Sequence, residues 1–215
     1  MHSSSTSTNL VFRGCNVNVQ SGSGSTAGTV NGYGNLIVGY NEALTSPSRG
    51  GSHNLIVGPK HNFSSYGGLA AGYESTVSGT YATVSAGRLN TASGDWSSVS
   101  GGGGGGDPAE YGGNVASHAL SSVSGGQGNE ANAYASSVTG GVHNTADDPG
   151  HYNTVSGGEN NLADRDYSSI SGGSDNTAQG VGSDISGGKN NLIGTSGDRA
   201  SVSGGSTRSV NGQYD

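Results

Sequence analysis

The stretch SSVSGGQGNEANAYASSVTGG, residues 121–141, nearly repeats itself after fifteen residues, because Ser121–Gly126 returns as Ser136–Gly141. Similar units run along most of the chain, each opened by an apolar residue, and fifteen is the commonest interval between them. The opening residues are Leu36, Leu55, Leu69, Val84, Val99, Val123, Val138, Val155, Ile170, Ile185 and Val202. Such periodicity in a chain with 43 glycines among 215 residues predicts a repeat architecture rather than disorder.

Each unit also carries a glycine three residues after its opening residue, a position that we expect to need left-handed backbone or close approach. These structural glycines are Gly39, Gly58, Gly72, Gly87, Gly102, Gly126, Gly141, Gly158, Gly173, Gly188 and Gly205. Alternation within a unit predicts strands, with the opening residue and the residue two positions later both facing inward.

A second inward position follows eight residues after the opening residue, as at Phe63, Val77 and Ala131. An asparagine two residues before it suits a corner, and stacked asparagines predict a hydrogen-bonded ladder. The expected corner asparagines are Asn90, Asn129, Asn144, Asn161, Asn176 and Asn191.

Fifteen residues leave room for two short strands and two tight corners. The predicted fold class is therefore all-β: a parallel β-solenoid, or flattened β-roll, of about eleven coils of ~15 residues spaced ~4.8 Å apart. We assign residues 35–215 to this repeat domain, with insertions near 43–53 and 103–119, and residues 1–34 to an N-terminal cap in which residues 8–19 form a strand. Each coil buries little apolar surface, which favours association of several chains.

Composition excludes several classes of partner. The net charge is −7, and the eight Lys and Arg residues form no basic stripe, so nucleic acid is not expected as a partner. No apolar run approaches the ~20 residues of a membrane span, so we expect no membrane insertion by this chain. The N-terminus lacks the charge and apolar pattern of a signal peptide. Cys15 is the single cysteine and excludes an internal disulfide.

The repeat resembles the head repeats of YadA-like trimeric autotransporter adhesins, with NLIVGYNE (35–42), NLIVGPKH (54–61) and GLAAGYESTVSGTYA (68–82) as the best matches. The resemblance implies a left-handed parallel β-roll, a homotrimer and an extracellular, cell-surface adhesive head. Its partners would be other copies of itself, in a trimer or a head-to-tail fibre, and a host surface, matrix or carbohydrate. Most coils here have fifteen residues rather than fourteen, and no stalk or membrane anchor follows the pattern, so a head fragment or a fibre protein is expected.

The sequence does not predict an enzyme, a cofactor or a metal site. No G-x-S-x-G motif is present, and the histidines lack metal-ligand spacing. We interpret the acidic pair Asp147-Asp148 and the segment ADRDY (163–167) as solvated corners. We interpret the histidines as solvated loop residues, since most lie in or beside insertions; they are His2, His53, His61, His118, His143 and His151.

An aromatic column is the first candidate contact surface. Its members stand at or next to the third position before the opening residue and would form a ridge along the stack. The ridge could bind sugar rings or another surface, or pack between subunits, and we favour the packing interpretation. The residues are Tyr66, Tyr81, Trp96, Tyr134, Tyr152 and Tyr167.

A hydroxyl lattice is the second candidate surface, because the residues that flank the opening residue are mostly Ser or Thr and would face outward. It resembles the Thr-x-Thr face of ice-binding β-solenoids, which makes ice binding the alternative function, although serine predominates here. Close packing of subunits through this small-residue face is favoured over ice binding. The lattice comprises Thr83, Ser85, Ser98, Ser100, Ser122, Ser124, Ser137, Thr139, Thr154, Ser156, Ser169, Ser171, Ser201 and Ser203.

Overall fold

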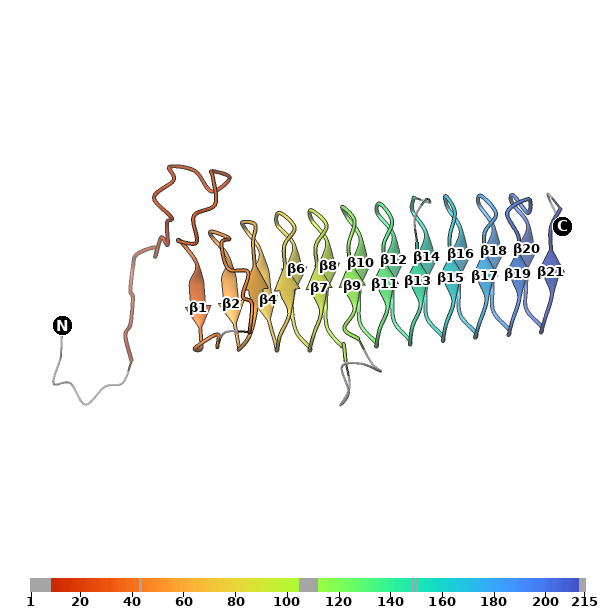
Figure 1. The fold of residues 1–215 in the computed structure, drawn as a ribbon, viewed down its shortest axis with the longest axis horizontal. Coiled ribbons are helices and arrows are strands. Elements are labelled where there is room, and N and C mark those ends of the chain that lie inside the picture. Colours follow the sequence, from red (N-terminus) through yellow and green to blue (C-terminus); the bar gives the residue numbers. More distant parts are fainter. Residues whose placement is uncertain (1–8, 43, 105–111, 148, 150, 213–215) are drawn as a thin grey trace.

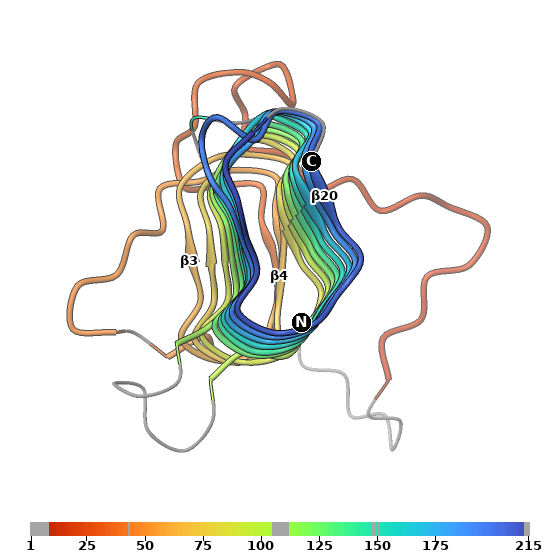
Figure 2. The same cartoon turned by 90° about the vertical axis from the view of Figure 1, so that its right-hand side faces the viewer.

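The computed structural model describes residues 9–42, 44–104, 112–147, 149 and 151–212. These residues contain no helix and form an all-β parallel solenoid of about eleven turns, which confirms the predicted fold class. Figure 1 shows the turns stacked side by side, from β1 near the N-terminal end to β21 near the C-terminal end. Figure 2, along the stack, shows two sheets facing each other and joined by two rows of corners.

The first sheet contains eleven strands, each paired in parallel with the strand of the next coil. Its strands are β1 (Leu36–Val38), β2 (Leu55–Val57), β4 (Leu69–Ala71), β6 (Thr83–Val84), β8 (Ser98–Val99), β10 (Ser122–Val123), β12 (Ser137–Val138), β14 (Thr154–Val155), β16 (Ser169–Ile170), β18 (Asp184–Ile185) and β20 (Ser201–Val202).

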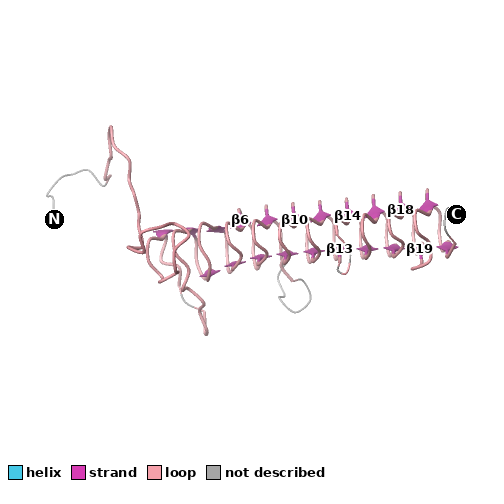
Figure 3. Ribbon diagram, turned by 90° about the horizontal axis from the view of Figure 1, so that it is seen from above, coloured by secondary structure: helices cyan, strands magenta, loops and turns pink. Residues whose placement is uncertain are grey.

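The second sheet contains ten strands with the same parallel order. Its strands are β3 (Asn62–Phe63), β5 (Thr76–Val77), β7 (Thr91–Ala92), β9 (Val115–Ala116), β11 (Glu130–Ala131), β13 (Thr145–Ala146), β15 (Leu162–Ala163), β17 (Thr177–Ala178), β19 (Leu192–Ile193) and β21 (Ser209–Val210). Figure 3 shows the two rows of strands from above.

The core lies between the two sheets, and in most coils each sheet contributes one buried hydrophobic residue to it. From Val84 onward the first sheet contributes a column of buried Val and Ile, and the second sheet contributes mostly alanine. Val138 and Ala146 illustrate the pair, since both side chains have no exposed surface. This narrow core follows from the sequence, because a coil of about fifteen residues has two inward positions between its corner side chains.

The first three opening residues were assigned to the wrong face. The register pairs Leu55 with Leu69 and Ile56 with Ala70, and Ala70 pairs with Val84. Ile56 and Ala70 are therefore the buried members of the column, whereas Leu55 points outward. The residues two positions after the opening residue do not face inward either: Val57 is exposed, and an added Cβ at Gly140 would meet no atom within 4 Å.

The glycine column lies at the corner after each strand of the first sheet. All eleven glycines have positive φ, from 73° at Gly102 to 112° at Gly39. From Gly58 to Gly188, an added Cβ would run into the backbone of the glycine in the following coil. This corner is therefore restricted to glycine both by backbone conformation and by the close approach of the next coil.

An asparagine ladder lies inside the same row of corners, as the sequence predicts. The backbone N–H of Asn144 donates to Oδ1 of Asn129 (2.9 Å), and that of Asn161 donates to Oδ1 of Asn144 (3.1 Å). Nδ2 of Asn144 donates to the carbonyl oxygens of Gly140 and Gly158, both at 2.9 Å. The ladder thus ties each corner to the coils before and after it.

The insertion near 103–119 is shorter than expected. Asn114 occupies a rung of the ladder, donating its backbone N–H to Oδ1 of Asn90 (2.9 Å), and Ala116 is fully buried in β9. Regular structure therefore resumes at Asn114, and residues 105–111 lie outside the described part. The long insertion obscured this coil because it displaced the second inward residue from its usual interval.

The N-terminal strand expected over residues 8–19 is not formed by Asn9–Val19. The segment instead leaves the solenoid sideways (Figure 2), with Leu10, Phe12 and Val17 exposed. Residues nearer to β1 do contact the first coils: the backbone N–H of Ser21 donates to Nε2 of His53 (3.0 Å). The alternation of apolar residues was a real strand signal, but the described structure offers this segment no partner strand.

Candidate ligand-contact surface

The aromatic ridge, defined as Tyr66, Tyr81, Trp96, Tyr134, Tyr152 and Tyr167, lies on one row of corners. These corners connect each strand of the second sheet to the next strand of the first sheet. Tyr66 is half-buried, and the others are exposed over 37% (Tyr134) to 63% (Tyr167) of their surface. The structure therefore leaves these rings accessible along one edge of the solenoid.

Several ridge residues have left-handed backbone, which is unusual for aromatic residues. Tyr81, Trp96, Tyr152 and Tyr167 have φ between 55° and 61°. The opposite row of corners makes the same demand and meets it from Gly128 to Asn190 with residue types that tolerate it, although Lys60, Glu74, Leu89 and Thr207 in that row also have positive φ. Its residues with positive φ include His143, Asn160, Asp175 and Asn190. Left-handed backbone costs roughly 1–2 kcal/mol for a residue with a Cβ, and exposed rings recover little of this by burial.

The rings contact one another in two groups. Tyr66 and Tyr81 meet edge to face, with ring centres 5.4 Å apart. In the second group Tyr134 meets Tyr152 edge to face at 5.9 Å, and Tyr152 stacks on Tyr167 at 5.2 Å with 10° between the ring planes. These contacts order the side chains, so the ridge presents preformed aromatic surface.

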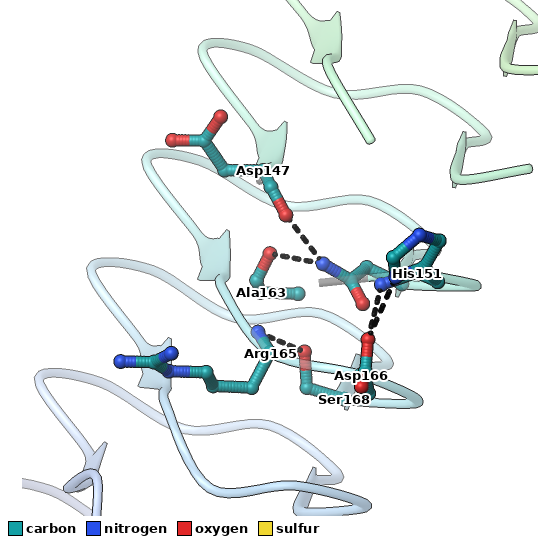
Figure 4. Close-up of polar contacts among 7 residues, drawn as sticks. Asp147, His151, Ala163, Arg165, Asp166 and Ser168 are labelled. Carbon is teal, nitrogen blue, oxygen red and sulfur yellow. Dashed lines mark hydrogen bonds and ion pairs between the residues drawn. The ribbon is translucent and has the colours of Figure 1, made fainter. Parts of the chain in front are cut away.

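Hydrogen bonds hold the residues on either side of Tyr152, and Figure 4 shows those of His151. The backbone N–H of His151 donates to Oδ1 of Asp166 (2.7 Å), and Nδ1 of His151 lies 3.0 Å from the same oxygen. The hydrogen bond from the His151 side chain holds the pKa of Asp166 below its usual range. Nδ2 of Asn153 donates to the carbonyl oxygens of Asp147 (2.6 Å) and Ala163 (3.3 Å). Tyr152 thus stands between two anchored neighbours.

Two further apolar residues, which the sequence pattern did not lead us to expect, lie on this edge. Leu120 has φ of 62° and an exposed side chain, and Val181 is also exposed. Leu120 stands three residues before Val123, the same interval that identifies Trp96 and Tyr152. The interval therefore identifies this corner position whether its residue is aromatic or aliphatic.

The hydroxyl lattice lies on the outer face of the first sheet, on either side of the buried Val and Ile residues. Ser122 pairs in register with Ser98 and Ser137, so equivalent hydroxyl groups recur once per coil. Asp184 interrupts the column after Ser169, whose Oγ donates to Oδ1 of Asp184. Before Thr83 the same column contains Leu36, Leu55 and Leu69, so this face has an apolar end and a hydroxylic remainder.

The histidines do not form a metal centre in the described residues, which contain no group of three or more His, Cys, Asp or Glu side chains able to hold a metal ion. His61 is fully buried and takes the place of a ladder asparagine. Its Nδ1 accepts the backbone N–H of Ser75 (3.2 Å), and Nε2 donates to the carbonyl oxygens of Val57 and Gly72 (both 3.1 Å). Burial lowers the pKa of His61, and the nearby charge of Arg49 acts in the same direction.

We expect the stability of the protein to decline as the pH falls below about 6.5, the ordinary pKa of an unfolded histidine. Because folding lowers the pKa of His61, the unfolded chain binds the proton first, and the stabilisation by neutral His61 is lost as the pH falls. Urea denaturation between pH 5 and pH 8 measures the effect. His61→Asn restores the common rung residue and should flatten this dependence; an unchanged slope would contradict the assignment.

The left-handed backbone at Trp96 gives a second stability prediction. Trp96→Gly should leave the free energy of unfolding unchanged or raise it by up to ~1 kcal/mol, because glycine removes the cost of positive φ at an exposed site. Trp96→Ala is the matched control, since it removes the ring but keeps a Cβ. Urea midpoints should therefore place the Gly variant above the Ala variant. The reverse order would show that the backbone at Trp96 is not strained.

Comparisons with known proteins provide no assignment. No protein-family model matches the chain, and no curated protein matches its sequence. In the described residues there is no helix long and apolar enough to cross a membrane.

Proposed function

We propose that the chain is a non-enzymatic, extracellular attachment module that contacts a carbohydrate through the aromatic ridge. The observation that carries this proposal is the placement of exposed aromatic rings on left-handed backbone at Tyr81, Trp96, Tyr152 and Tyr167. Strained backbone persists where function selects it, and the opposite corners show that this fold does not itself require aromatic residues there. We therefore attribute the aromatic residues of the ridge to function rather than to the stability of the fold.

Carbohydrate is the ligand class that fits this surface best. Sugar rings present C–H groups to aromatic faces, while their hydroxyl groups need polar partners. Asp166 and His151 lie beside Tyr152 and Tyr167 and supply exposed hydrogen-bonding groups. Because Tyr134, Tyr152 and Tyr167 stand in successive coils spaced ~4.8 Å apart, an extended β-linked glycan lying along the edge would meet these three rings in turn.

The proposal includes a left-handed roll and a homotrimer at the cell surface, with head-to-tail fibres as a further form of assembly. The narrow core supports association, since most coils from Val84 onward bury one Val or Ile and one Ala between the sheets. The resemblance of NLIVGYNE and NLIVGPKH to adhesin head repeats supports the same assembly.

Retention on solid polysaccharides tests the proposal. We expect the protein to bind microcrystalline cellulose or chitin, and Tyr152→Ala with Tyr167→Ala to reduce retention by ~10–100-fold, since each stacked ring contributes ~0.5–1.5 kcal/mol. Tyr40→Ala is the matched control, because Tyr40 is 93% exposed and lies outside the ridge. If neither polysaccharide retains the wild-type protein, or if the double variant binds equally well, the carbohydrate assignment fails.

The alternative function is ice binding through the hydroxyl lattice. Ser98, Ser122 and Ser137 form an in-register column on the outer face, and this regular spacing favours ice binding. Two features weigh against it: serine lacks the methyl group of threonine, and Asp184 breaks the column. Thermal hysteresis at millimolar protein concentration would support ice binding, particularly if Ser122→Lys with Ser137→Lys abolished it. Absence of hysteresis in the wild-type protein would exclude this alternative.

A further inference from the structure

Two apolar tripeptides near the N-terminal end are exposed along their whole length. The residues of Leu10-Val11-Phe12 are exposed over 60–82% of their surface, and those of Leu36-Ile37-Val38, which forms β1, over 46–53%. Scattered exposed apolar residues need no explanation, but continuous apolar runs on the surface are typical of contact sites. These two runs have equal length and apolar side chains at every position, so each would present apolar groups on both faces of a strand.

Among the described residues, the strand β1 has one free edge. It pairs with β2 through Leu36↔Leu55, Ile37↔Ile56 and Val38↔Val57, and it is the terminal strand of the first sheet. Ile37 shows the consequence: its register partner Ile56 is fully buried, whereas Ile37 is 46% exposed. Within the described residues the second sheet begins only with β3, in the following coil, so no strand lies opposite β1. The first coil therefore lacks neighbours beside and opposite its strand.

In the part of the chain that the structure describes, no strand pairs with the tripeptide Leu10–Phe12. Figure 2 shows the N-terminal segment passing out to the side of the roll, away from the two sheets. A bend at Gly14 and Cys15, with φ of 64° at Gly14, separates the tripeptide from the residues that continue toward the solenoid. The anchor of this segment is Ser21, whose backbone N–H donates to Nε2 of His53. The segment is thus an extended arm with a fixed base.

We propose that Leu10–Phe12 of one copy adds as an edge strand beside β1 of a second copy. Strand addition gives the free N–H and C=O groups of β1 hydrogen-bond partners and brings apolar residues against both faces of Leu36–Val38. The occupant is the arm of another chain because the arm projects away from its own roll. Each chain both donates an arm and accepts one, so the contact is heterologous and can close into a ring. A ring of three is the assembly expected for the proposed homotrimer.

A disulfide across the proposed contact tests it directly. In a Cys15→Ser background, Val11→Cys is combined with Ile37→Cys; these are the central residues of the two runs, so they face each other for either strand direction. Opposed residues of paired strands lie ~4.5–5.5 Å apart at Cα, within the range for a disulfide. After oxidation with glutathione disulfide, we expect non-reducing electrophoresis to show covalent oligomers, with three linked chains as the largest main species.

The products of oxidation distinguish arm exchange between chains from pairing within one chain and from no pairing. Covalent dimers alone would retain arm exchange but contradict a ring of three. A monomer without free thiols would mean that the arm pairs with its own β1, and a monomer with two free thiols would mean no pairing; either result overturns the proposal. Val17→Cys with Ile37→Cys is the matched control, because Val17 is an exposed arm residue beyond the bend, and it should give no such oligomers.

A second variant measures the contact without an engineered disulfide. Val11→Asp places a charge on an exposed arm residue that contributes nothing to the core, so the solenoid should remain folded. Light scattering should report a multiple of 21.0 kDa for the wild-type chain and 21.0 kDa for the variant. A monomeric wild-type protein, or a Val11→Asp variant with the wild-type mass, would also overturn the proposal. Neither measurement depends on carbohydrate binding, so this test and that of the carbohydrate assignment fail independently, although a monomeric wild-type protein would also contradict the proposed homotrimer.

Discussion

Gly141→Ala is expected to lower the free energy of unfolding by ~3 kcal/mol or more. Gly141 has φ of +89°, and an added Cβ would overlap the carbonyl oxygen of Gly158 and lie 2.5 Å from Nδ2 of Asn144 and 2.8 Å from the backbone nitrogen of Gly158. Backbone strain of this kind costs ~1–3 kcal/mol, and overpacking costs a similar amount. The neighbouring coil cannot move away without breaking its own pairing, so the two costs should add.

Gly140→Ala is the control for that prediction. Gly140 is adjacent in sequence, but an added Cβ there would meet no atom within 4 Å, and its φ is not in the left-handed region. The variant should match the wild-type protein or gain up to ~1 kcal/mol through the reduced entropy of the unfolded chain. Urea denaturation followed by circular dichroism measures both variants. Equal losses of unfolding free energy at the two positions would contradict the close approach of the Gly158 backbone to Gly141.

Asn144→Ala should cost ~3 kcal/mol. The substitution removes the donor to the carbonyl oxygens of Gly140 and Gly158 and the acceptor for the backbone N–H of Asn161. Each buried group left without a partner costs ~1–3 kcal/mol, and water cannot reach this rung because Asn144 is fully buried. Asn144→Asp should be at least as damaging, since a carboxylate cannot donate to the two carbonyl oxygens.

Asn160→Gly serves as the matched control for the ladder. Asn160 lies on the same row of corners but is exposed, and its side chain donates only to Oδ1 of Asp175 (3.3 Å) in the described structure. Glycine tolerates its φ of 54°, so the change in unfolding free energy should stay within ~0.5 kcal/mol. A loss at Asn160 as large as that at Asn144 would mean that corner asparagines stabilise the fold by a route other than the ladder.

The sequence predicted the repeat, the two strands per coil and the asparagine corner because each of these features recurs at one interval. The predicted inward-facing residues were wrong where three consecutive residues are apolar, because such a strand presents apolar side chains on both of its faces. In Leu55-Ile56-Val57 the hydrophobic pattern cannot tell which residue faces inward, and the glycine that followed gave the wrong register. Gly58 comes two residues after the buried Ile56, whereas Gly87 comes three residues after Val84, so later coils contain one extra residue before the corner.

The sequence predicted the ridge as a column of aromatic side chains, but it did not predict their left-handed backbone. Residue type argues against positive φ for Tyr152 or Trp96, so the strain that now distinguishes these residues is invisible in the sequence. His61 was missed for a similar reason: we interpreted it as a solvated loop residue, because its place in the ladder follows only from the spatial register with Asn41 and Ser75. Both cases depend on neighbours from other coils, which periodicity alone does not identify.

The coil between Val99 and Val123 accommodates extra residues in its corner without altering the stack. Ser98 still pairs with Ser122, and Ala92 pairs with Ala116, as in coils without an insertion. The length and sequence of this corner are therefore uncoupled from the scaffold. The same position could carry a foreign peptide, and its height along the rod could be chosen by adding or removing whole coils on either side.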